Sequence, residues 1–177
     1  KFEKKGTYEK VYIKTKKNYV LYNSPDEYTI KGMGIVRGDT SKLQKDIELT
    51  IMKELIKGKS RRELRKIAMK KLVNIKETPL DDLAFPKHIN LRKAYKVRTI
   101  MHRAKEYTEK NIGDLLYEDL VKYIFVNNVP LGKDPTDVIA LPRDKRLVDG
   151  YKIDYERIKK ASLRRIKDYI TLTLDDF

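Results

Sequence analysis

The hydrophobic pattern of the chain changes period near residue 39, and this change constrains the fold more than any other feature. Residues 8–37 contain three short stretches rich in Tyr, Val, Ile and Thr, with the turn cluster Asn-Ser-Pro-Asp before the last of them. From residue 41 onward the apolar residues follow helical spacing instead, beginning with Leu43, Ile47, Ile51 and Leu55. The sequence therefore predicts an α+β fold, in which a small antiparallel β segment over residues 1–40 precedes a mainly helical domain over residues 41–177.

Residues 41–177 are predicted to form four helices and one strand. A capping box over residues 41–44 begins the first helix, and Gly58 and Ser60 separate it from the second, which has an almost wholly basic outer face. Residues 77–90 contain two prolines and are predicted to be a connection. The remaining predictions are a third helix that packs inward through Val97, Ile100, Met101 and Ala104, a strand over residues 120–126, and a last helix from near Asp154.

The charge of the chain points to a polyanionic partner. The formal net charge is +15 and the sequence pI is near 9.7. Between Lys57 and Lys110 there are 17 Lys and Arg but only 6 Asp and Glu, so acidic residues do not alternate with the basic ones. Nucleic acid is the expected partner, and lipid headgroups are the weaker alternative because the basic residues spread over several elements. A cytoplasmic, nucleoid-associated protein of a prokaryote is expected, and the 38% content of charged residues is typical of thermophiles.

No pattern of catalytic or metal-binding residues is predicted. The chain has no cysteine, only His88 and His102, and no Asp-x-Asp pair that would bridge two magnesium ions. The adjacent acids 81–82 and 175–176 do not naturally converge on one ion. The glycine-bearing segment 32–38 lacks the spacing of a phosphate loop, so its glycines either permit a turn or let a nucleic-acid strand approach the backbone closely.

The order of several short motifs resembles the C-terminal palm and thumb region of family B DNA polymerases. Lys16-Lys17-Asn18-Tyr19 is similar to the family's Lys-Lys-x-Tyr motif at the palm edge, which holds the newly made duplex. The next family motif, approximately Lys-Gly-x-x-x-Val-Arg-Arg-Asp, supports the primer strand, and the matching residues here are Lys31, Gly32, Val36, Arg37 and Asp39. Gly38 stands where the family has its second arginine, so one phosphate contact or ion pair of the family is in doubt here.

Weaker matches cover the thumb. The segment 85–96 resembles a thumb segment of the family in which Leu91 and Tyr95 are the matching residues and the usual proline is missing. The segments 97–107 and 151–158 resemble the helix that follows and the entry to the last helix. Taken together, the resemblance predicts DNA contacts from the thumb residues Lys87, Arg92, Tyr95 and Arg98, in addition to Lys16, Lys17, Tyr19, Lys31, Gly32 and Arg37.

The resemblance implies a role in DNA synthesis without catalysis by this chain alone. The family's catalytic aspartates precede the matched region, so the chain is expected to be the small subunit of a split archaeal family B polymerase. Magnesium ions would be bound by the large catalytic subunit, and residues 1–40 would form the heterodimer interface. The C-terminus resembles a degenerate sliding-clamp peptide, with Leu174 and Phe177 matching and Thr171 replacing a glutamine. The alternatives are a free-standing nucleic-acid-binding protein and an interaction subunit whose charge serves solubility.

Overall fold

A computed structural model describes residues 6–90, 92, 97–167 and 169–170, and within them the chain has an α+β fold. The first sheet is an antiparallel meander with the order β1-β2-β3. In the second sheet the order is β4-β5-β6, and β7 also pairs with β5. The strands are β1 (Lys10–Thr15), β2 (Asn18–Tyr22), β3 (Tyr28–Lys31), β4 (Phe85–His88), β5 (Leu120–Asn128), β6 (Val138–Ala140) and β7 (Lys152–Ile153).

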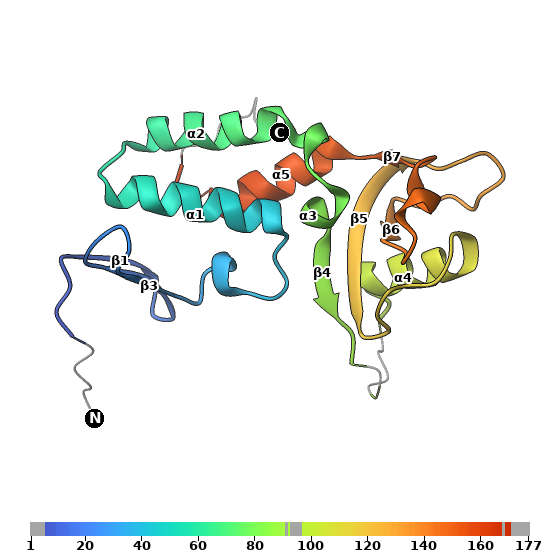
Figure 1. Ribbon diagram of the computed structural model, residues 1–177, viewed down its shortest axis with the longest axis horizontal. Helices are drawn as coiled ribbons and strands as arrows, with labels where there is room; N and C mark the ends of the chain where they lie inside the picture. The colour runs from blue at the N-terminus through green and yellow to red at the C-terminus, as the bar shows by residue number, and fades with distance from the viewer. Residues whose placement is uncertain (1–5, 91, 93–96, 168, 171–177) are drawn as a thin grey trace.

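The helices lie in two groups around these sheets (Figure 1). Figure 1 shows α1 between α2 and the meander, and α5 runs back from the second sheet to cross α1. The α-helices are α1 (Lys42–Ile56), α2 (Arg61–Val73), α3 (Leu80–Leu83), α4 (Ile100–Asn111) and α5 (Tyr155–Ile166), and the short 3-10 helices are η1 (Gly34–Val36), η2 (Ile75–Glu77) and η3 (Lys145–Val148). The return of α5 brings the end of the described chain back to its beginning.

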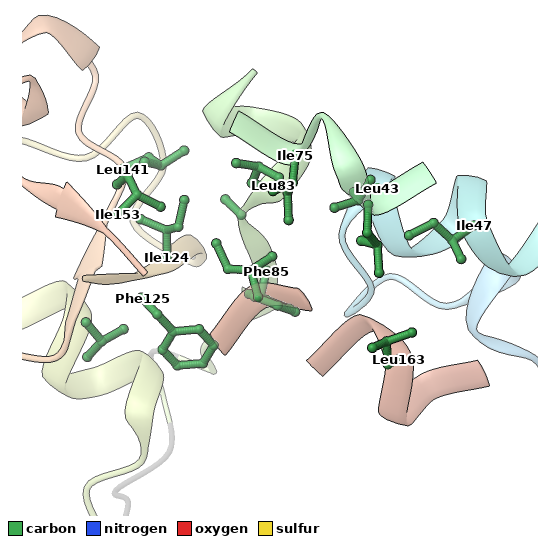
Figure 2. Close-up of a cluster of buried hydrophobic side chains, with 14 of the residues drawn as sticks. Leu43, Ile47, Ile75, Leu83, Phe85, Ile124, Phe125, Leu141, Ile153 and Leu163 are labelled. Carbon is green, nitrogen blue, oxygen red and sulfur yellow. The ribbon is translucent and has the colours of Figure 1, made fainter. Parts of the chain in front are cut away.

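One hydrophobic core joins the two groups of elements. Figure 2 shows this core around Phe85 of β4: side chains of α1 and α5 lie on one side of the ring, and side chains of β5 and β7 lie on the other. Phe85 stacks on Tyr123 at 5.5 Å between ring centroids. The buried cluster includes side chains of the meander, of α1 and α5, and of the second sheet, so the hydrophobic core is continuous from one group to the other.

Local sequence signals account for the first two helices. Ser41 caps α1 by accepting a hydrogen bond from the backbone N–H of Gln44 at 3.3 Å. Ser60 begins α2 with a complete capping box, in which the Glu63 carboxylate accepts from the Ser60 backbone N–H at 2.9 Å. Gly58, with φ +90°, adopts the left-handed conformation that ends α1. The predicted start, break and restart of these helices are confirmed.

The second sheet departs from the sequence prediction. Residues 77–90 are not only a connection, since they contain α3 and β4, and β6 and β7 were likewise absent from the predicted elements. Pro86 has no backbone N–H to donate, and it is compatible with a strand because β4 is at the edge of its sheet and has a neighbouring strand on one side only. The inward packing predicted for Val97 is wrong: its side chain is 72% exposed, and α4 begins three residues later at Ile100.

Candidate nucleic-acid interface

The two basic lysines of the Lys-Lys-x-Tyr motif form the tight turn between β1 and β2. Thr15 pairs with Asn18 across this turn, which leaves Lys16 and Lys17 exposed at its tip. Tyr19 follows in β2 and lies opposite Lys31 of β3. Since directly opposite residues of an antiparallel pair project from the same face, the register places Tyr19 and Lys31 side by side.

Gly32 brings the second motif against this turn. It has φ +67°, a conformation that side chains disfavour, and a Cβ atom here would overlap the carbonyl oxygen of Lys17 and Oδ1 of Asn18. The sequence left two roles open for the glycines, and for Gly32 the structure shows the turn-forming one. Gly32 therefore allows the segment after β3 to pack beneath the Lys16–Lys17 turn.

Asp39 connects Arg37 to Lys87 of β4. The guanidinium of Arg37 donates to both carboxylate oxygens of Asp39 at 3.1 Å, and Lys87 Nζ donates to Oδ2 at 3.2 Å. Burial alone would raise the pKa of Asp39, but the hydrogen bond from Lys87 and the charge of Arg37 outweigh burial and hold this pKa below its usual value. Three residues predicted from two distant motifs thus form one charge cluster.

A pocket of about 250 Å³ lies where the meander, η1, α1 and α5 meet. We call it the junction pocket; among the described residues its charged lining residues are Lys14, Arg37, Glu48, Arg164 and Arg165, and Asn18, Gly32 and Gly34 line it as well. The pocket thus shares residues with both palm-like motifs. The sequence did not predict Arg164 or Arg165 as site residues, because only the return of α5 to α1 brings them there.

Arg165 and Tyr169 fasten α5 to the beginning of the chain. Arg165 Nη2 donates to Oγ1 of Thr40 at 2.9 Å, and its Nε lies 3.7 Å from the buried carboxylate of Glu48. The hydroxyl of Tyr169 donates to Glu48 Oε1 at 3.5 Å, and the Lys14 ammonium lies 4.9 Å from the centre of the Tyr169 ring. These contacts fix the pocket wall that α5 supplies.

A second basic surface lies on α2. Arg62, Lys66 and Lys70 are exposed and follow one another at intervals of four residues, about 6 Å along the helix axis. They form no ion pair within the described part of the chain, so like charges face one another along this stripe. Figure 1 shows α1 between α2 and the meander, so the structure does not join this stripe to the Lys16–Lys17 turn.

The other predicted site residues are more scattered. Arg92 is exposed, and Arg98 pairs with Glu106 of α4 at 2.8 Å; no contact of the described residues links either of them to the Asp39 cluster. Tyr95, Leu174 and Phe177, together with Leu91 and Thr171, lie outside the described residues.

The acids 81–82 form ion pairs instead of a shared ion site. Asp81 contacts Lys122 at 3.2 Å and also pairs with Lys145, while Asp82 pairs with Lys42 at 2.9 Å. The described residues contain no group of three or more His, Asp or Glu placed to hold a metal ion. None of the helices described is both long and apolar enough to cross a membrane.

Comparisons with known proteins agree with the fold described above. No protein-family model and no curated protein matches the chain. Among solved structures, the chain is similar to the family B DNA polymerase from the hyperthermophilic archaeon Pyrobaculum calidifontis, with a TM-score of 0.62 and 21% sequence identity. The similarity covers 94% of this chain and 22% of the polymerase chain. The chain therefore has the fold of part of a family B DNA polymerase.

Proposed function

We propose that this chain supplies the end of the palm and the thumb to a family B DNA polymerase, as the small subunit of a split enzyme. The observation that carries the proposal is the fold similarity over 94% of the chain. The Lys16–Lys17 turn and the Gly32 segment lie at its palm-like end, in the order that the family motifs predict. The neighbour's archaeal source is consistent with an archaeal split enzyme.

The basic residues of the palm-like end would hold the primer-template duplex through its phosphates. Lys16 and Lys17 are exposed at a turn tip, where ammonium groups reach phosphate oxygens without disturbing the sheet. Phosphate contacts position a duplex without specifying its sequence, as a polymerase requires. In this proposal the present chain only positions the DNA. Phosphoryl transfer itself would use magnesium ions bound by the aspartates of the large subunit.

The outward face of the meander is the expected contact with the large subunit. Val11 and Ile13 of β1 are 52% and 69% exposed, and the register places them opposite Leu21 and Tyr19 of β2. Apolar neighbours on an exposed sheet face favour a protein contact. Both β1 and β3 are also edges of the described sheet and offer backbone groups for pairing with another strand.

Primer extension tests this proposal. A family B catalytic chain without its own thumb is assayed with and without the present chain, and we expect synthesis to be stimulated. Lys16→Ala/Lys17→Ala should weaken the stimulation, whereas Lys133→Ala/Lys152→Ala, which removes the same charge from exposed positions elsewhere, should leave it unchanged. Equal loss in both variants would show that net charge alone acts, and would refute a specific role of the turn.

A free-standing nucleic-acid-binding protein is the alternative, and the exposed cationic stripe of α2 favours it. This function predicts tight duplex binding with a steep dependence on salt and no effect on any catalytic chain. Removing Arg62, Lys66 and Lys70 together would then weaken binding more than the Lys16→Ala/Lys17→Ala change. The proposed polymerase function predicts the opposite order for stimulation of synthesis.

A further inference from the structure

The basic surface of α2 points away from the core of the molecule. We call Arg62, Lys66 and Lys70 the α2 stripe, and all three side chains are exposed. Each of them stands two residues before a buried apolar residue of the helix, and two residues of an α-helix turn through about 200°. The buried residues are Leu64, Ala68 and Leu72. The stripe therefore occupies the face of α2 opposite to the face that packs on the core.

Among the described residues, acids neutralise cations on other helical faces but not on the α2 stripe. On the side of α2 next to α1, Lys71 pairs with Asp46 at 2.8 Å. Three basic residues of α4 are paired as well, at distances between 2.7 and 2.9 Å: Arg103, Lys105 and Lys110. Glu63, the one acid of α2, instead contacts Ser60 and Lys59. No described acid forms an ion pair with the stripe, so its like charges repel one another and a polyanion would neutralise them.

We propose that the α2 stripe binds the phosphate backbone of a DNA duplex, at a site separate from the Lys16–Lys17 turn. The stripe spans about 12 Å along the helix axis, and each strand of a duplex carries a phosphate about every 3.4 Å of its own axis. The three cations therefore face several phosphates of one strand. A duplex fits better than a single strand, because α2 contains no aromatic residue on which an unpaired base could stack.

The position of α2 separates this contact from the one at the turn. Figure 1 shows α1 between α2 and the meander, and the stripe lies on the face of α2 that is turned away from the core. Duplex DNA is stiff over about 50 nm, so a duplex lying along this face does not curve around α1 to the turn. The inference goes beyond the proposed function, in which only the palm-like end holds DNA, and it does not depend on it.

Two other occupants fit the stripe less well. A helix that binds an anionic membrane inserts its apolar face, but that face of α2 is buried, and only Met69 and Val73 remain exposed, at 39% and 72%. An acidic protein would need carboxylates placed to match three cations in a line. A duplex presents its charges at regular intervals in any register, so it needs no such match.

The test counts how many short duplexes the full chain binds at low salt, by titration calorimetry. The stripe variant carries Arg62→Gln, Lys66→Gln and Lys70→Gln. The control variant carries Lys133→Gln, Arg143→Gln and Lys152→Gln, which likewise removes one arginine and two lysines from exposed positions. Glutamine is about as good a helix former as lysine or arginine, so the stripe variant should stay folded, and circular dichroism checks this.

We expect the wild type and the control variant to bind two duplexes, and the stripe variant to bind one. Lys16→Ala/Lys17→Ala should also bind one duplex, through the stripe. In that background, fluorescence anisotropy of a labelled duplex should show that the stripe substitutions reduce the salt slope by about 2.7, or about 0.9 for each of three phosphate contacts.

Equal duplex binding by the stripe and control variants would overturn the inference, and a loss in Lys16→Ala/Lys17→Ala alone would then leave the proposed function standing. A single duplex that both sets of substitutions weaken would overturn the separate site. A single duplex that only the stripe variant loses would support the stripe and count against the turn. If the stripe variant binds DNA like the control but loses binding to anionic vesicles or to the catalytic chain, the stripe belongs to that partner and the inference is wrong. If the wild type binds no duplex, both proposals fail.

Discussion

Gly34→Ala should destabilise the chain because Gly34 leaves room for the contacts that hold α5. Gly34 is buried in η1, and a Cβ atom there would overlap Nε and Nη2 of Arg165 and Oε2 of Glu48. The guanidinium is the flexible partner and would move away. It would then lose its hydrogen bond to Thr40 and its approach to Glu48.

The cost follows from these lost contacts. A hydrogen bond from a charged group contributes about 1.5–3 kcal/mol, and separating Arg165 from a buried carboxylate adds to it. The raised pKa of Glu48 limits the second contribution, since the carboxyl can take up a proton when its cation leaves. We therefore expect the free energy of unfolding to fall by about 3 kcal/mol, which lowers the Tm by about 6–12 °C for a chain of this size.

Gly38→Ala is the matched control within the same motif. No heavy atom lies within 4 Å of a Cβ atom at Gly38, and its φ is not positive. Removing this glycine restricts the unfolded chain, so the change should be neutral or stabilising by up to about 1 kcal/mol. Urea denaturation followed by circular dichroism measures both variants. In the background of Arg165→Ala, the cost of Gly34→Ala should fall, because the guanidinium that it displaces is no longer there and only the overlap with Glu48 Oε2 remains. The reasoning is refuted if Gly34→Ala and Gly38→Ala unfold at the same midpoint, or if Gly34→Ala costs as much without Arg165 as with it.

Two further predictions concern buried polar groups. The hydroxyl of Thr108 on α4 donates to the carbonyl of Ala140 at 3.1 Å and accepts from its N–H at 2.9 Å, so Thr108→Val should lower the free energy of unfolding by about 3 kcal/mol. The hydroxyl of Thr50 on α1 donates only to the Asp46 carbonyl of its own helix, so Thr50→Val should lower it by less than about 0.5 kcal/mol. Denaturation of the two variants under the same conditions gives the comparison, and similar losses would contradict it. The folded-state pKa of Glu48 is raised above 4.5, so the native chain binds more protons than the unfolded chain above that pH, and the contribution of Glu48 to stability falls as pH rises from 4.5 through the folded pKa. Glu48→Gln should remove this decline, and its stability relative to wild type should therefore grow over that window; a difference that stays constant with pH would contradict the prediction.

The elements that could be predicted from the sequence are those whose signals are local. The helices α1 and α2 each begin with a serine cap, and apolar residues at helical spacing follow it directly. The break between them depends only on the left-handed backbone conformation of Gly58. The strands β4, β6 and β7 have only 4, 3 and 2 residues, too few for an alternating pattern to appear. Pairing with β5, which lies outside each of these short segments, makes them strands.

The candidate site divides in the same way. The order of the two palm-like motifs predicted that Lys16 and Gly32 belong together, and the close approach of Gly32 to the Lys17 carbonyl gives the physical reason. Arg165 carried no such signal, because a basic residue near the end of a helix is ordinarily solvated. Its partner Thr40 is 125 residues away, and only the complete fold brings the two together.

This separation in sequence has a consequence for how the site can function. The junction pocket takes Lys14, Arg37 and Glu48 from the first third of the chain and Arg164 and Arg165 from its last part. Its wall from α5 exists only while α5 is docked on α1, and that docking depends on the core around Phe85. A change that loosens α5 must therefore weaken the pocket even when it touches none of the pocket residues. Loss of stability and loss of the pocket are coupled here, whereas the turn of Lys16 and Lys17 is local and should keep its shape when α5 is displaced.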